Sequence, residues 1–428
     1  MPDDTMRIAM RELISAAFML CAVPAFAGMP ALHGDGVHDD TAAIQARLDA
    51  GACCVYLPPP AKEYLISKAL KIGSGQELRL DRFTRIRLAP GSDTPMLVNK
   101  GVGDGDRRIA VTGGIWDYDN TRQSPNPHQG KFLNPPREIA KPDKFDPNFH
   151  LGVIIRLDNV RDLVVRGLTL RNPTTYALQL TRTSYFLVDD IEFDFTTWNP
   201  IPLNMDGVHL DGGCHHGKIS NLRGTCFDDL VALNANDGIC SNFQGPIRDV
   251  DIDGIYAEYC HSAVRILSNG ADVRGINISN VHGNFYRYVV GITHYFRDSP
   301  PGTFDQISIR DCRVGWARIP DALPLKPGYH RWPLVWCENK CDIGSLRIEN
   351  FVRDEYFGGY VPTIGVDPRA TVRSLTIRDS GHRNHTKDNL AFLCVQGKVG
   401  ELTLDKPRFE SDPGAGENIE RDDTWPLR

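Results

Sequence analysis

Long hydrophobic runs, basic clusters and metal-binding cysteine spacings are scarce in this chain. Its 48 lysines and arginines are outnumbered by 54 aspartates and glutamates, and no basic run exceeds two residues. Nucleic-acid binding therefore has no support in the composition. No Cys-x-x-Cys pair or His-rich partner segment occurs, so we expect no metal and no cofactor. After residue 27, no apolar stretch is long enough to span a bilayer, and we expect no membrane contact.

The segment 1–27 has the layout of a secretory signal peptide. Arg7 and Arg11 precede an apolar stretch that ends in Ala-Phe-Ala, with small residues at both positions that define a cleavage site. A membrane anchor would need about 20 apolar residues, and this stretch is shorter. We therefore predict that the protein is secreted or periplasmic and that Gly28 starts the mature chain.

Export makes disulfide bonds relevant. The chain has 11 cysteines, and loss of Cys21 with the signal peptide leaves an even number. Cys337 and Cys341 are close enough in sequence to close a small ring, and Cys240 with Cys260 is a second candidate pair. Free buried thiols are the alternative for several of them.

A pattern of two apolar residues separated by one residue returns along the chain. Each instance is followed by a turn-forming or polar residue. It occurs at Leu163/Val165, Val250/Ile252, Ile276/Ile278, Ile307/Ile309, Leu346/Ile348, Leu375/Ile377 and Leu402/Leu404. The period is about 27 residues with loop insertions, which is typical of a solenoid.

This alternation predicts strands rather than helices. Apolar residues at helical spacing are scarce in these segments, and the frame of leucine-rich repeats is missing. The sequence therefore predicts an all-β fold, a right-handed parallel β-helix that forms one domain over residues 28–428.

One short helix is expected near the mature start, in the segment DDTAAIQARLDAG. Asp39 or Asp40 can cap its N-terminus, Ile44 and Leu48 share one face, and Gly51 can end it. Because the open end of a solenoid would expose apolar core, we predict that this helix caps the N-terminal end.

Two insertions interrupt the repeat, near 118–148 and 313–341. Insertions in a solenoid tend to gather on its binding face. The second insertion carries the aromatic residues Trp316, Tyr329, Trp332 and Trp336. Such rings can stack on sugar faces, and we take Trp332 as a candidate substrate-binding residue, with core packing as the alternative.

Acidic residues cluster in LNMDGVHLDGG and GTCFDDLVALNAND, where they form two groups about one coil apart. They are Asp206, with Asn204 beside it, and the pair Asp228 and Asp229. Neighbouring strands lie about 4.8 Å apart, so the two groups can place carboxylates side by side. Such a pair can break a glycosidic bond, with one carboxylic acid protonating the leaving oxygen while another group activates water. A turn role is the alternative for each Asp.

These segments resemble glycoside hydrolase family 28, the polygalacturonases and related β-helix enzymes. The resemblance lies in GLTLRNPTTYALQL, NMDGVH, FDDLVALNA and CHSAVRIL, in this order, and DGVHDDTAAIQ resembles the opening segment of such β-helices. It implies that Asp228 is the general acid, that Asp206 and Asp229 activate water, and that hydrolysis inverts the anomeric centre.

The sequence also departs from the family pattern. The Gly-His-Gly segment of the family has no counterpart after FDDLVALNA. Arg265 matches the Arg of the family's Arg-Ile-Lys, but Leu267 replaces the Lys. In polygalacturonases that Arg and Lys hold a substrate carboxylate, so polygalacturonan as the substrate is in doubt, whereas the acid chemistry is not.

Two histidines are candidates for substrate hydrogen bonds, with packing roles as the alternative. His261 precedes the Arg265 segment, and His209 follows Asp206 by an odd number of positions. On a regular strand the side chains of Asp206 and His209 would face opposite sides, unless Gly207 distorts the backbone.

The leading hypothesis is a secreted glycoside hydrolase that binds a polysaccharide containing acidic, pectin-like sugars along the β-helix. A lyase or epimerase on the same scaffold is the first rival. It would need a basic residue that takes the C5 proton, and often Ca²⁺. A non-catalytic glycan-binding protein is the second rival. The sequence gives neither the oligomeric state nor the sugar.

Overall fold

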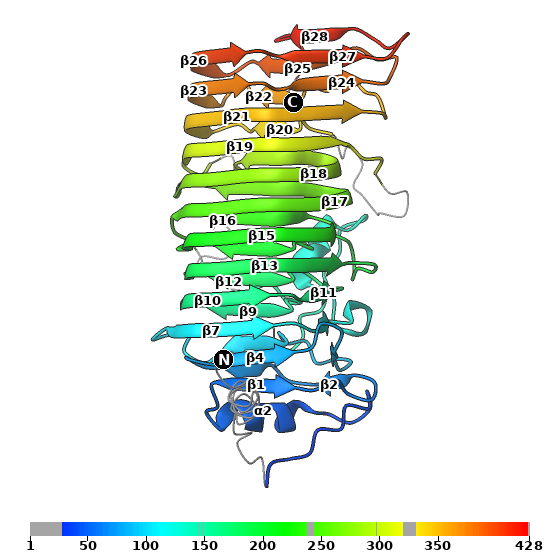
Figure 1. The fold of residues 1–428 in the computed structure, drawn as a ribbon, viewed down its shortest axis with the longest axis vertical. Coiled ribbons are helices and arrows are strands. Elements are labelled where there is room, and N and C mark those ends of the chain that lie inside the picture. Colours follow the sequence, from blue (N-terminus) through cyan, green and yellow to red (C-terminus); the bar gives the residue numbers. More distant parts are fainter. Residues whose placement is uncertain are drawn as a thin grey trace, which may run out of the picture.

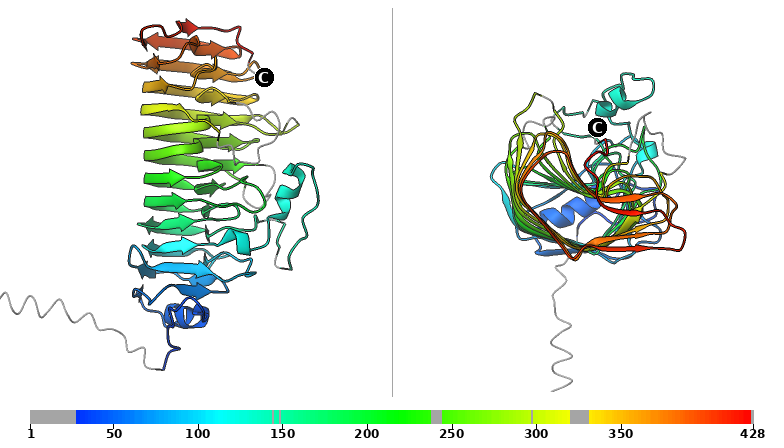
Figure 2. Two further views of the ribbon diagram at one scale, coloured as in Figure 1. Left: turned by 90° about the vertical axis from the view of Figure 1, so that its right-hand side faces the viewer. Right: turned by 90° about the horizontal axis from the view of Figure 1, so that it is seen from above.

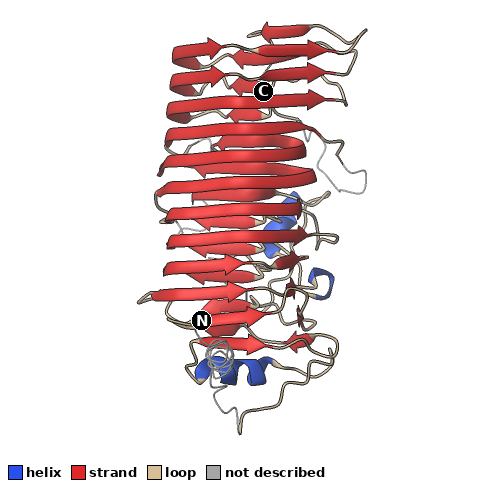
Figure 3. Ribbon diagram, in the orientation of Figure 1, coloured by secondary structure: helices blue, strands red, loops and turns tan. Residues whose placement is uncertain are grey.

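The chain winds through stacked coils in which each strand pairs in parallel with strands of the coils before and after it (Figures 1 and 3). The computed structural model describes residues 28–143, 145–147, 149–237, 244–296, 298–319 and 331–426. The predicted signal peptide, Cys240 and Tyr329 lie outside these residues. The strands form three stacks, and the longer ones turn the corners between stacks.

The first stack consists of β1 (Cys54–Leu57), β4 (Glu77–Leu80), β7 (Asp106–Thr112), β10 (Val160–Arg166), β13 (Ser184–Asp194), β15 (His215–Thr225), β17 (Ile247–Ser268), β18 (Asp272–Thr293), β19 (Gly302–Trp316), β21 (Cys341–Glu355), β23 (Thr371–Arg378) and β26 (Lys398–Asp405). The second stack consists of the later parts of β13, β15, β17, β18, β19 and β21 together with β2 (Tyr64–Ile66), β5 (Arg85–Leu88), β8 (Ile115–Asp117), β11 (Thr169–Arg171), β24 (Gly381–Asn384) and β27 (Arg408–Ser411).

The third stack carries the candidate site. It consists of the ends of β17 and β18 together with β3 (Leu70–Ile72), β6 (Leu97–Asn99), β9 (Ile155–Asp158), β12 (Leu178–Thr181), β14 (Val208–Asp211), β16 (Asp229–Asn236), β20 (Val335–Cys337), β22 (Ile364–Val366), β25 (Leu390–Val395) and β28 (Asn418–Arg421). The prediction of a right-handed parallel β-helix is confirmed.

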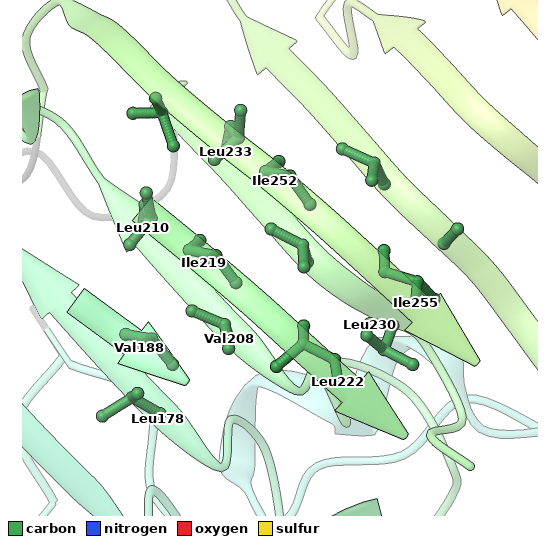
Figure 4. Packing of buried hydrophobic residues seen from close by; sticks show 14 of the residues in the cluster. Leu178, Val188, Val208, Leu210, Ile219, Leu222, Leu230, Leu233, Ile252 and Ile255 are labelled. Carbon is green, nitrogen blue, oxygen red and sulfur yellow. The ribbon is translucent and has the colours of Figure 1, made fainter. Parts of the chain in front are cut away.

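Apolar side chains from the stacks meet inside the coils. Leu178, Val208 and Leu233 of the third stack and Ile219 and Ile252 of the first are fully or almost fully buried in the same cluster (Figure 4). This cluster extends along the chain from Ile44 to Val395. Burial of apolar surface is worth about 25 cal/mol per Å², so it supplies most of the driving force for stacking.

The helix α2 (Thr41–Asp49) lies across the N-terminal end of the coils, as predicted (Figure 2). Its Ile44 and Leu48 side chains are buried in the core. The Asp39 carboxylate accepts the Thr41 N–H at 2.9 Å, and Gly51 follows the helix in a left-handed conformation with φ of 78°. No helix among the described residues is both long and apolar enough to cross a membrane.

The first insertion projects from the side of the coils between β8 and β9 (Figure 2). It contains two short 3₁₀ helices, η1 (Asn120–Arg122) and η2 (Pro127–Phe132). The second departure from the repeat begins later than predicted, because β19 continues to Trp316, whose side chain is buried in the core. For Trp316 the structure therefore supports the alternative of core packing.

The candidate Cys337–Cys341 disulfide is not formed, and the alternative of free thiols holds. Both side chains are buried free thiols, and the Cys341 Sγ is directed at the Ile292 carbonyl, 3.4 Å away. Cys337 ends β20 and Cys341 begins β21, and the short turn between these two strands separates the thiols. Cys260 instead lies beside Cys226, with 3.0 Å between the sulfur atoms.

Candidate active site

Most of the predicted site residues gather where the chain enters the third stack on consecutive coils. They are Asn204, Asp206, Asp228, Asp229, His261 and Arg265. The register aligns Asp229 with Ser262 of the next coil, and Ser262 with Tyr288 of the coil after that. Strands about 4.8 Å apart bring these side chains within reach of one another.

Asp206 lies in the turn before β14 and is almost fully buried. One of its carboxylate oxygens accepts the Asp229 N–H at 3.1 Å, and the other lies 2.7 Å from the His209 Nδ1. The two side chains therefore meet, and the separation expected for a regular strand does not apply. Strand alternation begins only at Val208, so it does not govern the direction of a side chain in the preceding turn.

The His209 side chain is fully buried and held on both sides by carboxylates. Its Nε2 lies 3.2 Å from the Asp211 Oδ1, and its ring stacks on Tyr176 with 3.6 Å between centroids. Burial disfavours the charged form, but Asp211 and Asp206 outweigh this effect and raise the pKa of His209 to about 9. His209 is therefore an imidazolium at neutral pH, and its contacts are with the protein.

Asp228 is the carboxylate of the cluster that keeps some solvent contact, at 7% exposure. Its Oδ2 accepts the Asn204 N–H at 2.7 Å, and its Oδ1 lies 3.5 Å from the His261 Nδ1. Burial and the neighbouring charges of Asp229 and Asp206 raise the pKa of Asp228 well above its ordinary value. Asp228 is thus suited to carry a proton and donate it.

Asp229 is completely buried and has stronger partners. Its Oδ1 accepts hydrogen bonds from the hydroxyls of Ser262 and Tyr288, the latter at 3.4 Å. Its Oδ2 lies 2.9 Å from the Arg265 Nε, but the N–H is misaligned, so the two atoms form an ion pair without a hydrogen bond. Burial raises the pKa of Asp229, and the charge of Arg265 opposes that rise.

Arg265 is engaged by protein groups on several sides. Besides Asp229, its Nη1 donates to the Tyr295 hydroxyl at 2.5 Å and its Nη2 to the Asn234 Oδ1 at 3.2 Å. Leu267, at the position where the family has Lys, is fully buried. The arrangement holds Arg265 beside Asp229 and leaves no cation at position 267.

His261 lies at the rim of the site next to Asp228. Its Nδ1 is 2.8 Å from the Ser262 Oγ. Burial, with the charges of Arg287 and Arg265, lowers the pKa of His261 well below its ordinary value. A neutral imidazole at this place can accept or donate a hydrogen bond to a sugar hydroxyl.

Trp332 lies further along the same face. The register runs from Arg265 through Gly291 to Trp336, and Trp332 stacks on Trp336 with 4.9 Å between ring centroids. Trp332 is half-buried, whereas Trp336 is fully buried. The guanidinium of Arg287 lies 5.4 Å from the Trp332 ring centroid.

Sequence reasoning missed several members of the cluster. They are Tyr176, Asp211, Asn234, Ser262, Tyr288 and Tyr295. Asp211 could have been identified by strand alternation from His209. Ser262 could have been identified by its spacing of one coil from Asp229. Tyr288 and Tyr295 lie on a later coil and carry no local motif.

Among the described residues, one group has ligand atoms close enough to share a metal ion. One atom each of Asp228, Asp229 and His261 lie within 4.8 Å of one another. Arg265 already places a positive charge 2.9 Å from the Asp229 Oδ2. The ion pair neutralises that carboxylate without a metal.

Fold and site together define a right-handed parallel β-helix protein with a buried carboxylate cluster on its flank. No family model matches the chain, and no curated protein matches it. Solved structures share the fold at low identity. The endo-xylogalacturonan hydrolase of Aspergillus tubingensis is 14% identical with a TM-score of 0.54, covering 91% of this chain and 94% of its own.

Two further similar structures have other printed functions. The surface adhesin PfbA of Streptococcus pneumoniae is 13% identical with a TM-score of 0.56, covering 90% of this chain and 91% of its own. The A-module of the Azotobacter vinelandii mannuronan C-5 epimerase is 12% identical with a TM-score of 0.53, covering 90% of this chain and 97% of its own. At such identity these likenesses show the fold alone.

Proposed function

We propose that this protein is a glycoside hydrolase that cleaves a polysaccharide containing acidic sugars. The observation that carries the proposal is the contrast between two adjacent carboxylates. Asp228 has a strongly raised pKa and is 7% exposed, whereas Asp229 is paired with Arg265 and fully buried. Such a difference in environment assigns the acid and base roles of a glycosidase.

In this mechanism Asp228 donates its proton to the glycosidic oxygen as the bond breaks. Asp229 and Asp206 take the proton of the attacking water. The Asp229 Oδ2 accepts no hydrogen bond from the described residues, so it has lone pairs for that step. Arg265 and the His209 imidazolium place positive charge beside these two carboxylates. His209 and Arg265 thereby act as positioning residues, while Asn204, His261 and Trp332 border the substrate.

The family resemblance leads us to expect inversion. Inverting glycosidases usually separate their carboxyl groups by about 6.5–9.5 Å to leave room for water. In this cluster one oxygen each of Asp228 and Asp229 lie within 4.8 Å of one another, which is closer than that separation. Proton NMR of the first product reports its anomeric form and tests this expectation.

One specific observation favours the lyase and epimerase alternative. His261, beside Asp228, is neutral and is a base that could take a C5 proton. A screen against plant, algal and bacterial polysaccharides separates the alternatives. Hydrolysis gives new reducing ends without new ultraviolet absorbance, and a lyase adds an absorbing double bond. Epimerisation changes sugar composition without cleavage. Binding with no chemical change would leave the adhesin alternative and overturn the proposal.

The export prediction belongs to the same proposal. A polysaccharide is too large to enter a cell intact, so an enzyme that acts on one is expected outside the cytoplasm. The basis remains the composition of residues 1–27. N-terminal sequencing of the protein recovered from its native host tests for a mature chain that begins at Gly28.

A further inference from the structure

A hollow of about 930 Å³ lies in the first insertion, within the segment 127–141. Its lining includes Lys131, Arg137 and Lys141, against one carboxylate, Glu138. The ammonium groups of Lys131 and Lys141 lie 5.0 and 5.9 Å from phenylalanine ring centroids. Within the described part of the chain, no carboxylate forms an ion pair with any of the three cations. The hollow is therefore a positively charged surface large enough for sugar units.

This hollow adjoins the catalytic cluster. The Gln129 Nε2 donates to the Leu203 carbonyl, and the next residue, Asn204, donates its N–H to Asp228. A second series of contacts connects the hollow to the cluster through aromatic rings. His128, in the wall of the hollow, is 5.0 Å from His150, and His150 is 5.0 Å from Tyr176, which stacks on His209.

Buried polar side chains fix the insertion to the coils. Asn120 donates at 2.9 Å to the carbonyls of Pro173 and Thr197. Both Asn120 and Gln129 are fully buried, as is Asn126, whose side chain accepts the His128 N–H at 3.2 Å and begins η2. These contacts hold residues 120–129 of the insertion, and with them the wall of the hollow at His128, against the coils beside the site.

We propose that this hollow is a subsite for an acidic sugar unit, whose carboxylate is bound by Arg137 and Lys141. The inference rests on the proposed function and answers the question raised by Leu267. The site lacks the family's lysine, and Arg265 is committed to Asp229, Tyr295 and Asn234. At the cluster a chain of uronic acids would face the three aspartates, whereas the hollow offers charge complementarity within reach of the same chain.

The test compares the double variant Arg137→Gln/Lys141→Gln with the surface control Lys398→Gln, which is exposed in β26 far along the coils. On an acidic glycan we expect the double variant to raise KM about tenfold or more, with kcat within about twofold. The control should match the wild type, and a neutral glycan should show no change. Unchanged melting temperatures show that folding is intact.

Calorimetric binding of a uronic acid oligosaccharide to Asp228→Asn protein needs no turnover and separates this inference from the proposed function. Weaker binding in the added double variant supports the subsite even if no hydrolysis is found. Equal binding with and without the two cations overturns it, even if hydrolysis is confirmed. A sulfated oligosaccharide in a parallel titration tests the anion. Preference for sulfate over carboxylate would overturn the uronic acid assignment.

Discussion

At the scale of single residues, neighbouring positions in the chain acquire opposite properties. Asp228 and Asp229 are adjacent, but Asp229 faces Arg265, Ser262 and Tyr288, whereas the nearest partners of Asp228 are the Asn204 N–H and a neutral His261. An ionised Asp229 raises the proton affinity of Asp228. Removal of either carboxylate should therefore change the pKa of the other.

The change Asp228→Asn tests the general acid. The amide keeps the shape and the acceptor for the Asn204 N–H but cannot deliver a proton. We expect kcat to fall by about 10² to 10⁴, while glycan binding persists. The melting temperature should hold or rise slightly, since the amide is neutral at every pH and never repels Asp229. Asp272→Asn, exposed at the start of β18, is the matched control. Full activity in Asp228→Asn would contradict the proposed mechanism.

The change His209→Gln tests the buried imidazolium through pH. Because the pKa of His209 is raised from 6.5 to about 9, its stabilising contribution is complete below pH 6.5 and is lost as the pH rises through 9. The variant leaves Asp206 and Asp211 without their cation, at a cost of about 3–5 kcal/mol. Melting curves should show a large deficit at pH 6 that shrinks towards pH 9.5. A deficit independent of pH would mean that His209 is neutral in the folded protein.

At the scale of elements, the strands were predictable because a narrow interior demands an apolar residue at every second position. Leu163, Ile276 and Leu375 are all buried in the core, as the pattern indicates. The same rule failed at Asp206, which lies in a turn where alternation does not apply. It could not find Tyr288 or Tyr295 either, since their place beside Asp229 depends on register between coils.

Trp332, just before β20, and Trp336, within β20, form an aromatic pair whose members should behave differently. Trp336 is fully buried, and half-buried Trp332 stacks on it. Trp332→Ala should raise KM for the glycan severalfold with little change in melting temperature, because a flat ring is lost from the substrate face. Trp336→Ala removes core packing at a cost of about 3–5 kcal/mol and should mainly lower the melting temperature. Enzyme kinetics and melting curves on both variants check this. The reverse pattern for Trp332 would mark it as a packing residue.

At the scale of the whole molecule, the coils share one interior. The buried apolar cluster extends from Ile44 to Val395, and parallel pairings continue from β1 to β28. In a solenoid each coil is stabilised mainly by its neighbours, so we expect that the chain does not divide into two independently folding halves. The sequence predicted this from the repeat, and the cap helix α2 follows from the need to cover the open end.

Limited proteolysis should therefore nick the protein without dividing it. We expect cleavage in the exposed insertion around 131–141, where the lining side chains are solvent-accessible and the backbone has few hydrogen bonds. The pieces should migrate together in native size-exclusion chromatography, because the ladders of β7 with β10 and of β6 with β9 span that insertion. They should separate only in denaturant. Two fragments of comparable size that elute apart and remain folded would show two domains in place of one.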